Sequence, residues 1–300
     1  MMTILLGILE EGLIYAIMAL GVYITYKILD FPDLSVDGTF PLGAALTAGL
    51  IVKGIPPAAA LPLSFLAGAI AGCITGLIHV KCRVRDLFSG IIVMTALYSV
   101  NLRIAGMRAN LPFLSQDTIF DNEWTRNQVP DPIKPYILVL ILAAITIICK
   151  LLLDWYLGTR SGYLLQAAGD NDTLVTSLAM DKGLVKVIGL SIANGFAALA
   201  GGILAQKQAF FDISIGTGTM VFGLASVILG TQLFKRFSMV RTTTAVIAGA
   251  ILYKACVAFV ISIRIVKATD LKLITAAILL LILVISDSLK RKGAHPHVGA

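Results

Sequence analysis

The sequence predicts an all-α polytopic integral membrane protein with about 8–10 transmembrane helices. The 300-residue chain is 58% hydrophobic and only 14% charged, whereas a soluble domain carries about 25% charged residues. Its apolar residues form long runs without the period-two alternation of a β-barrel. This composition excludes a soluble enzyme or nucleic-acid binder. The net charge of +7 therefore indicates Lys and Arg at cytoplasmic membrane edges, and we expect no nucleic-acid partner.

Eight apolar runs are long enough, or nearly so, to span the hydrocarbon core. They cover residues 4–26, 57–80, 87–106, 136–153, 186–206, 217–234, 242–263 and 271–288. The run 39–52 is too short to cross alone, so we expect a short or broken second helix there. We expect residues 1–290 to form a single transmembrane domain and residues 291–300 to form a flexible cytoplasmic tail.

Three basic clusters predict the orientation of the chain. They are Lys81, Arg83 and Arg85; Lys235, Arg236 and Arg241; and Lys290, Arg291 and Lys292. Counting spans places all three on one side, which is then cytoplasmic together with residues 154–185. Residues 107–135 then lie outside. If 39–52 crosses fully, the chain has nine spans and its N-terminus is also outside; otherwise the N-terminal side reverses.

The external segment 107–135 contains four prolines, which exclude one continuous helix. At roughly thirty residues it is longer than a bare connector. Two interpretations stay open, a docking surface for an external partner and a solvated cap.

Residues 29–41 place three carboxylates and two prolines between apolar runs. We expect Pro32 and Pro41 to prevent a regular helix, and Asp33 or Ser35 to cap the helix that follows. Irregular backbone at membrane depth must line a cavity or be buried in protein. The segment is therefore either a broken helix beside a translocation path or a surface loop with ordinary caps.

Polar side chains within the apolar runs are candidates for lining a translocation path. They are Asp33, Ser35, Asp37, Thr39, Thr95, Tyr98, Asn101 and Asn194. Taken singly, each is explained at least as well by a hydrogen bond between helices. The small residues from Ser191 to Gly202 predict close helix packing rather than contact with a solute.

Lys254 lies deep within the run 242–263, where an unpaired cation costs several kcal/mol. Glu10 and Glu11 lie at a similar depth in the first run. We therefore predict an intramembrane ion pair between Lys254 and one of these glutamates. An internal brace is a better explanation of this pair than a proton relay.

The motifs of enzymes are missing from this sequence. It has no GxxxxGK[ST] phosphate loop, no HExxH or other His/Cys zinc spacing, and no GxSxG elbow. We expect no catalytic site, no metal site and no cofactor bound by this chain. Many apolar helices with few intramembrane charges favour transport, and an ion-gradient-driven secondary transporter is one alternative.

The cytoplasmic segment around residues 158–180 predicts two short surface helices. The first covers Tyr163–Ala168 with Gly169 as a left-handed C-terminal cap, and the second begins at residues 170–172 and ends near Met180. Such a rigid pair can transmit force from a soluble partner to the spans, but taken alone these residues are explained better as a plain linker.

Several motifs resemble the permease subunits of ABC importers, in the branched-chain amino-acid and ribose permease superfamily. They are Arg160-x-Gly162, Ala167-Ala168-Gly169-Asp170-Asn171, Ala179-Met180, the small-residue span Asn194–Gly202, Asp33–Gly38 and Gly12–Gly21. The resemblance covers about residues 10–290. It departs from the superfamily at Gly230-Thr231 and Lys235-Arg236, where members often carry paired glycines. The chain is most similar to a branch linked to aromatic amino acids and related solutes.

This resemblance implies a mechanism and a set of partners. The residues that would couple the chain to an ATPase groove are Leu164, Leu165, Gln166, Ala167, Gly169, Asp170 and Asn171. ATP and Mg would then be bound by separate ABC ATPase subunits. A permease homodimer, an external solute-binding protein and membrane lipid would complete the assembly. The implied location is the bacterial inner membrane.

Overall fold

A computed structural model describes residues 2–170, 181–235 and 240–262, together with five single positions near the C-terminus. Within these residues, seven helices are long and apolar enough to cross a bilayer, which confirms the predicted class. They correspond to the first seven long runs of the sequence. The predicted span 271–288 lies outside the described residues except for isolated positions, as does the whole tail 291–300.

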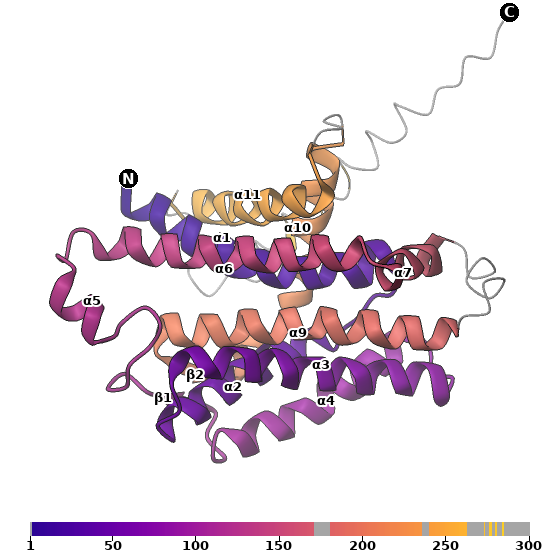
Figure 1. Cartoon of the computed structure of the whole chain (residues 1–300), viewed down its shortest axis with the longest axis horizontal. Helices are drawn as coiled ribbons and strands as arrows, with labels where there is room; N and C mark the ends of the chain where they lie inside the picture. Colours follow the sequence, from indigo (N-terminus) through magenta and orange to yellow (C-terminus); the bar gives the residue numbers. More distant parts are fainter. Residues whose placement is uncertain are drawn as a thin grey trace, which may run out of the picture.

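The structure is built almost entirely from helices, and Figure 1 shows most of the long ones lying roughly along one direction. The helices are α1 (Met2–Val22) with its π-helical extension η1 (Tyr23–Ile28), α2 (Val36–Val52), α3 (Pro57–Lys81), α4 (Asp86–Ile104), α5 (Glu123–Gln128), α6 (Lys134–Leu157), α7 (Arg160–Asp170), α9 (Lys182–Gln208), α10 (Thr219–Leu233) and α11 (Thr242–Ser262). Strands β1 (Asn110–Pro112) and β2 (Phe210–Asp212) pair antiparallel, and the 3-10 turn η2 covers Ile213–Gly216.

The two ends of the helix bundle differ in structure. The N-terminal end of α1, the short helix α5 and the β1–β2 pair lie at one end, and α7 lies at the other (Figure 1). In the predicted orientation the first end is external. The segment 107–135 is folded there, because α5 starts with a capping box between Asn122 and Thr125 and Arg126 bridges Asp117 and Asp121 at 3.2 and 2.8 Å.

Helix α9 is the centre of the bundle and packs closely against α2 and α3. A Cβ atom added to Gly201 would collide with the carbonyl oxygen of Phe40, and one added to Gly195 would lie 2.8 Å from the ring of Phe65. The small residues of α9 therefore let neighbouring backbones approach, which confirms their predicted packing role.

Helix α2 corrects part of the prediction for residues 29–41. Pro41 lies inside the helix rather than ending it, because in the second turn its missing N–H removes only the bond to the carbonyl of Asp37. Ser35 is the N-cap residue, but its side chain makes no capping bond. Asp33 instead accepts the backbone N–H of Ser35 at 2.9 Å, so the predicted side-chain caps of α2 are wrong.

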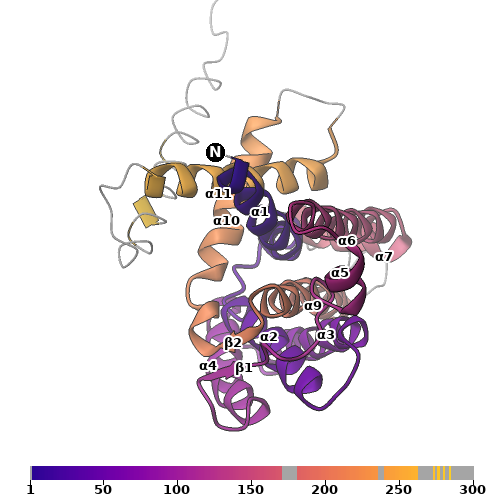
Figure 2. The same cartoon turned by 90° about the vertical axis from the view of Figure 1, so that its left-hand side faces the viewer.

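The chain interrupts its helices twice, before α2 and before α10. Ala209 has φ 57° and Gly218 has φ 85°, and between them β2 and η2 lead the chain back into the bundle. Figure 2 shows α10 running from the region of α1 and α11 toward α2 and α4. A Cβ on Gly216 would collide with the carbonyl oxygen of Asp37, so the beginnings of α2 and α10 meet inside the bundle.

Candidate functional site

A cavity of about 510 Å³ lies where the two interrupted helices begin, and we call it the polar cavity because six of its ten lining residues have polar side chains. It is lined by Asp37, Gly38, Pro41, Met94, Thr95, Tyr98, Asn101, Ile213, Ser214 and Thr217. These residues come from α2, α4 and the segment that leads into α10. The structure thus brings together four of the eight predicted path residues, namely Asp37, Thr95, Tyr98 and Asn101.

Asp37 fixes the start of α10. Its carboxylate accepts the backbone N–H groups of Gly218 at 3.0 Å and Met220 at 2.7 Å, and the hydroxyl of Thr219 at 2.9 Å. A carboxylate at a helix N-terminus satisfies free N–H groups and opposes the positive end of the helix dipole. One side chain of α2 therefore holds the first turn of α10 beside the cavity.

Asn101 is the cavity residue with an unsatisfied polar atom. Its side chain is fully buried, and its Nδ2 donates to the carbonyl oxygen of Gly38 at 3.1 Å. Its Oδ1 has no hydrogen-bond partner among the residues that the structure describes. A buried acceptor without a partner is unusual in folded proteins, so Oδ1 is free to accept a hydrogen bond from a donor outside these residues.

The other four predicted path residues form a separate buried cluster that ties α2 to α9. Asn194 donates to Asp33 at 2.7 Å, and its Oδ1 accepts the hydroxyls of Thr39 at 2.8 Å and Ser35 at 3.1 Å. The hydroxyl of Ser35 also lies 2.6 Å from Asp33. All four side chains are fully buried in this protomer, so the contacts account for them as a brace. Their role in lining a path stays a prediction.

Two ion pairs connect α1 with its neighbours. Lys254 Nζ lies 3.0 Å from Glu11 and 3.8 Å from the ring centre of Tyr15, so the structure contains one of the two predicted pairings. Glu10 instead pairs with Lys207 at 2.8 Å. Sequence reasoning missed Lys207, although its place just after the run 186–206 puts it at the same membrane edge as Glu10.

The predicted coupling segment begins with one helix that is longer than expected. Helix α7 continues through Gly169 to Asp170, so the predicted left-handed cap at Gly169 is wrong. Residue 169 is a glycine because α7 packs closely on η1 there, and a Cβ would collide with the carbonyl oxygen of Ile28. Leu165 of α7 is buried near Gly189 of α9. Asn171 and the predicted second helix lie outside the described residues.

A second ionic cluster, which sequence reasoning also missed, joins α6 to α11 near α7. Asp154 lies 2.7 Å from Lys150 and 3.2 Å from Arg241, and it accepts the hydroxyl of Thr243 at 2.7 Å. The sequence signal for this contact was that Asp154 directly follows the run 136–153 and that the basic cluster with Arg241 is predicted on the same side of the membrane. This contact fastens the helix that precedes α7.

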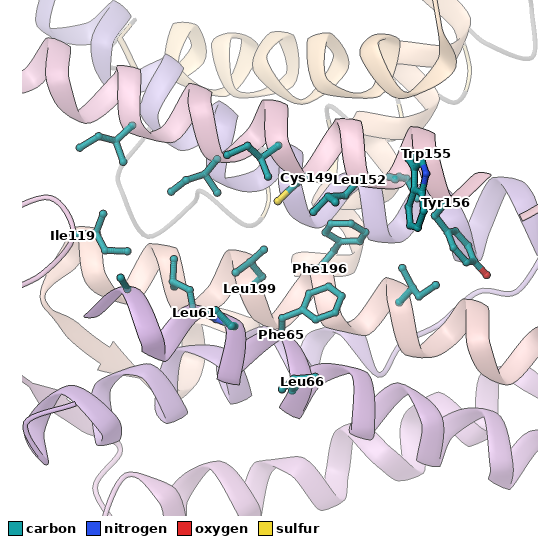
Figure 3. A pocket seen from close by; sticks show the side chains of 17 residues that line it. Leu61, Phe65, Leu66, Ile119, Cys149, Leu152, Trp155, Tyr156, Phe196 and Leu199 are labelled. Carbon is teal, nitrogen blue, oxygen red and sulfur yellow. The ribbon is translucent and has the colours of Figure 1, made fainter. Parts of the chain in front are cut away.

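An apolar crevice of about 790 Å³ separates α6 from α3 and α9 (Figure 3). Side chains such as Phe65, Leu152 and Phe196 line it, and it contains none of the predicted site residues. Hydrocarbon suits such walls better than a polar solute does. The polar cavity is therefore the better candidate for contact with a transported molecule.

Among the described residues, no group of three or more His, Cys, Asp or Glu side chains is placed to hold a metal ion. Seven apolar helices, two helix interruptions and a polar cavity where they meet define a multi-pass membrane transport subunit. The chain belongs to the family described as branched-chain amino acid transport system / permease component, which matches residues 4–285.

Several relatives of this chain are named as transport or import permeases. A tyrosine transport system permease protein of Clostridioides difficile is 43% identical over 98% of this chain and 96% of its own length. A ribose import permease protein of Escherichia coli is 25% identical over 75% of this chain and 68% of its own length. A probable branched-chain amino acid transport permease of Methanocaldococcus jannaschii is 25% identical over 71% and 70%. No solved structure matches the chain.

These relationships settle the class of transporter. The chain is a permease subunit of an ABC importer in the bacterial inner membrane, and the ion-driven alternative is set aside. Members of the family are transport permeases rather than enzymes.

Proposed function

We propose that this permease imports an aromatic amino acid, with tyrosine as the first candidate. The support is the 43% identity to a tyrosine transport permease, extending over nearly the full length of both chains. Relatives named for ribose and branched-chain amino acids are 25% identical over shorter stretches. An external solute-binding protein delivers the solute to the folded external segment 107–135.

The polar cavity between α2, α4 and α10 is where we place the path of this solute. Thr95 and Tyr98 lie on the exposed side of α4, and Tyr98 is 55% exposed. Polar groups at membrane depth do not face hydrocarbon when another protein surface is available to cover them. A second copy of the permease across α4 therefore encloses the cavity and makes it half of a central path.

Energy enters through separate ABC ATPase subunits that bind ATP and Mg, and helix α7 is the contact. Tyr163 on α7 is 65% exposed at the cytoplasmic end of the predicted orientation, where a partner groove can receive it. The opposite side of α7 packs on η1, directly before the interruption that contains Asp33. A movement of α7 is thereby transmitted to the hydrogen-bonded cluster around Asn194 and then to α2 beside the cavity.

The test is uptake by the complete transporter in proteoliposomes, containing this permease, its ATPase and its binding protein. We expect ATP-dependent uptake of labelled tyrosine that excess phenylalanine inhibits and excess ribose or leucine does not. A non-hydrolysing ATPase variant serves as the matched control and should abolish uptake. Uptake of ribose or leucine in place of tyrosine would refute the proposed solute while leaving the permease class intact.

A further inference from the structure

We propose that Asp37 and Asn101 form an acceptor subsite that binds the ammonium group of the transported solute. This inference rests on the proposed function, because it places the solute in the polar cavity. It goes beyond that function by naming which chemical group of the solute is recognised and by which atoms.

The carboxylate of Asp37 keeps an acceptor position open. A carboxylate offers about four lone-pair sites. Two donors reach Oδ1, from Thr219 and Met220, and one reaches Oδ2, from Gly218. Among the described residues, no Lys or Arg forms a salt bridge with Asp37, so only hydrogen bonds and the start of α10 oppose its charge. A negative charge at membrane depth favours a cation beside it.

Asn101 supplies the second acceptor. Its amide donates to the carbonyl oxygen of Gly38, the residue that follows Asp37 in α2, and this bond orients the side chain. That bond leaves Oδ1 as the atom without a partner among the described residues, although the side chain is fully buried and lines the cavity. A primary ammonium group, with three donors, satisfies Oδ1 and the open position on Asp37 together.

The rest of the cavity wall favours an amine over an acid. The ten lining residues include one carboxylate and no Lys, Arg or His. A free carboxylate would find hydroxyl and amide donors there but no cationic side chain, and it would meet the negative charge of Asp37. The exposed ring of Tyr98 offers an aromatic surface to an apolar or aromatic side chain of the same solute.

The experiment measures binding to the full-length permease in complex with its ATPase, in lipid nanodiscs and without the binding protein. The probes are radiolabelled tyramine, which has the amine and no carboxylate, and 3-(4-hydroxyphenyl)propionate, which has the carboxylate and no amine. We expect a scintillation-proximity assay to detect tyramine binding and little binding of the acid. Equal binding of both probes would overturn the proposal.

Two variants separate recognition from a structural role. Asn101→Leu and Asn101→Asp both remove the amide donor to Gly38, but only Asn101→Asp keeps acceptor atoms in the cavity. We expect Asn101→Leu to weaken tyramine binding about tenfold or more and Asn101→Asp to retain it. Equal weakening by both variants would show that the bond to Gly38, not the acceptor, is what matters. Asn110→Leu, at an exposed position, is the matched control.

The same preparations distinguish this inference from the proposed function. Tyrosine uptake by the complete transporter without any preference for the amine probe would overturn the subsite and leave the function in place. Binding of tyramine that depends on Asn101 without tyrosine uptake would support the subsite and refute tyrosine as the solute.

Discussion

At the residue scale, a few buried polar side chains organise a bundle that is otherwise held by apolar contacts. Asn194 is the clearest case, because its amide donates to Asp33 and its carbonyl accepts hydroxyls from Ser35 and Thr39. Water is scarce at this depth, so each of these groups depends on the others for hydrogen bonds. The cluster thus specifies one register of α2 on α9.

Replacing Asn194 by leucine should destabilise the permease. The substitution leaves Asp33 Oδ2 without its amide donor and removes an acceptor that the hydroxyls of Ser35 and Thr39 share, which costs about 1–3 kcal/mol. Thermal unfolding of the purified chain in nanodiscs measures the effect, with Asn110→Leu as the exposed control. Equal melting temperatures for Asn194→Leu and the control would contradict the role of the brace.

Removing Glu11 and removing Lys254 should lower the stability of the permease by different amounts. The Lys254 side chain is 10% exposed and that of Glu11 is 49% exposed. Glu11→Gln leaves a buried cation, whereas Lys254→Met leaves a carboxylate that is only half buried by the protein. We expect Glu11→Gln to cost more, though less than the about 3–5 kcal/mol typical of fully buried pairs.

Unfolding midpoints of the two single variants and of the double variant Glu11→Gln/Lys254→Met check this order. The double variant should be more stable than Glu11→Gln alone, because the stranded cation is gone. A double variant less stable than either single one would argue against pairing.

At the scale of elements, the interrupted helices and α7 form one connected set. Helix α7 touches η1, η1 leads into the segment that contains Asp33, and α2 then meets the start of α10 through Asp37. A π-helical turn is often found at functional positions of helices, since its widened hydrogen-bond pattern is easily rearranged. This continuity gives a physical route from the ATPase contact to the cavity.

Gly169→Ala should lower coupling without preventing folding of the spans. The added methyl group collides with the carbonyl oxygen of Ile28 and separates α7 from η1. We expect solute-stimulated ATP hydrolysis by the reconstituted transporter to fall several-fold while basal hydrolysis persists.

Gly158→Ala is the matched control for this substitution. Gly158 has φ −83°, and the nearest atom to an added Cβ is 3.4 Å away, so alanine fits there. Comparable loss of stimulation in both variants would show that Gly169 has no special part in coupling.

At the scale of the whole molecule, the exposed side of α4 is where we place the second copy of the permease. The polar cavity opens beside this helix, whereas the crevice along α6 is apolar and suits lipid. A cysteine at Tyr98 should therefore form a crosslinked dimer in native membranes, in a background where the four native cysteines are replaced.

Ile147→Cys, on the exposed side of α6, is the control and should remain monomeric after oxidation. Crosslinking at Ile147 but not at Tyr98 would contradict this prediction and show that the dimer interface involves α6 instead of α4. Gel electrophoresis without reducing agent distinguishes these results.

Much of this architecture follows from the chain itself. The seven long spans of the described residues follow from run length, because a helix that crosses the bilayer needs about twenty apolar residues. The short α2 and a charged pair at Lys254 also follow from the cost of broken backbone and buried charge in lipid. The predictions for Pro41 and Gly169 were wrong. Pro41 costs α2 only one backbone hydrogen bond, and the glycine at 169 is required by contact with Ile28, which local propensity does not include.

The sequence by itself determined the membrane class, the spans, the permease family and a set of polar residues at membrane depth. Only the tertiary structure divided those residues into a hydrogen-bonded cluster around Asn194 and a cavity that Asp37 and Asn101 line. The physical reason is that hydrogen-bond partners come from distant parts of the chain. Asp37 and Gly218, for example, are brought together by helix packing and not by their spacing.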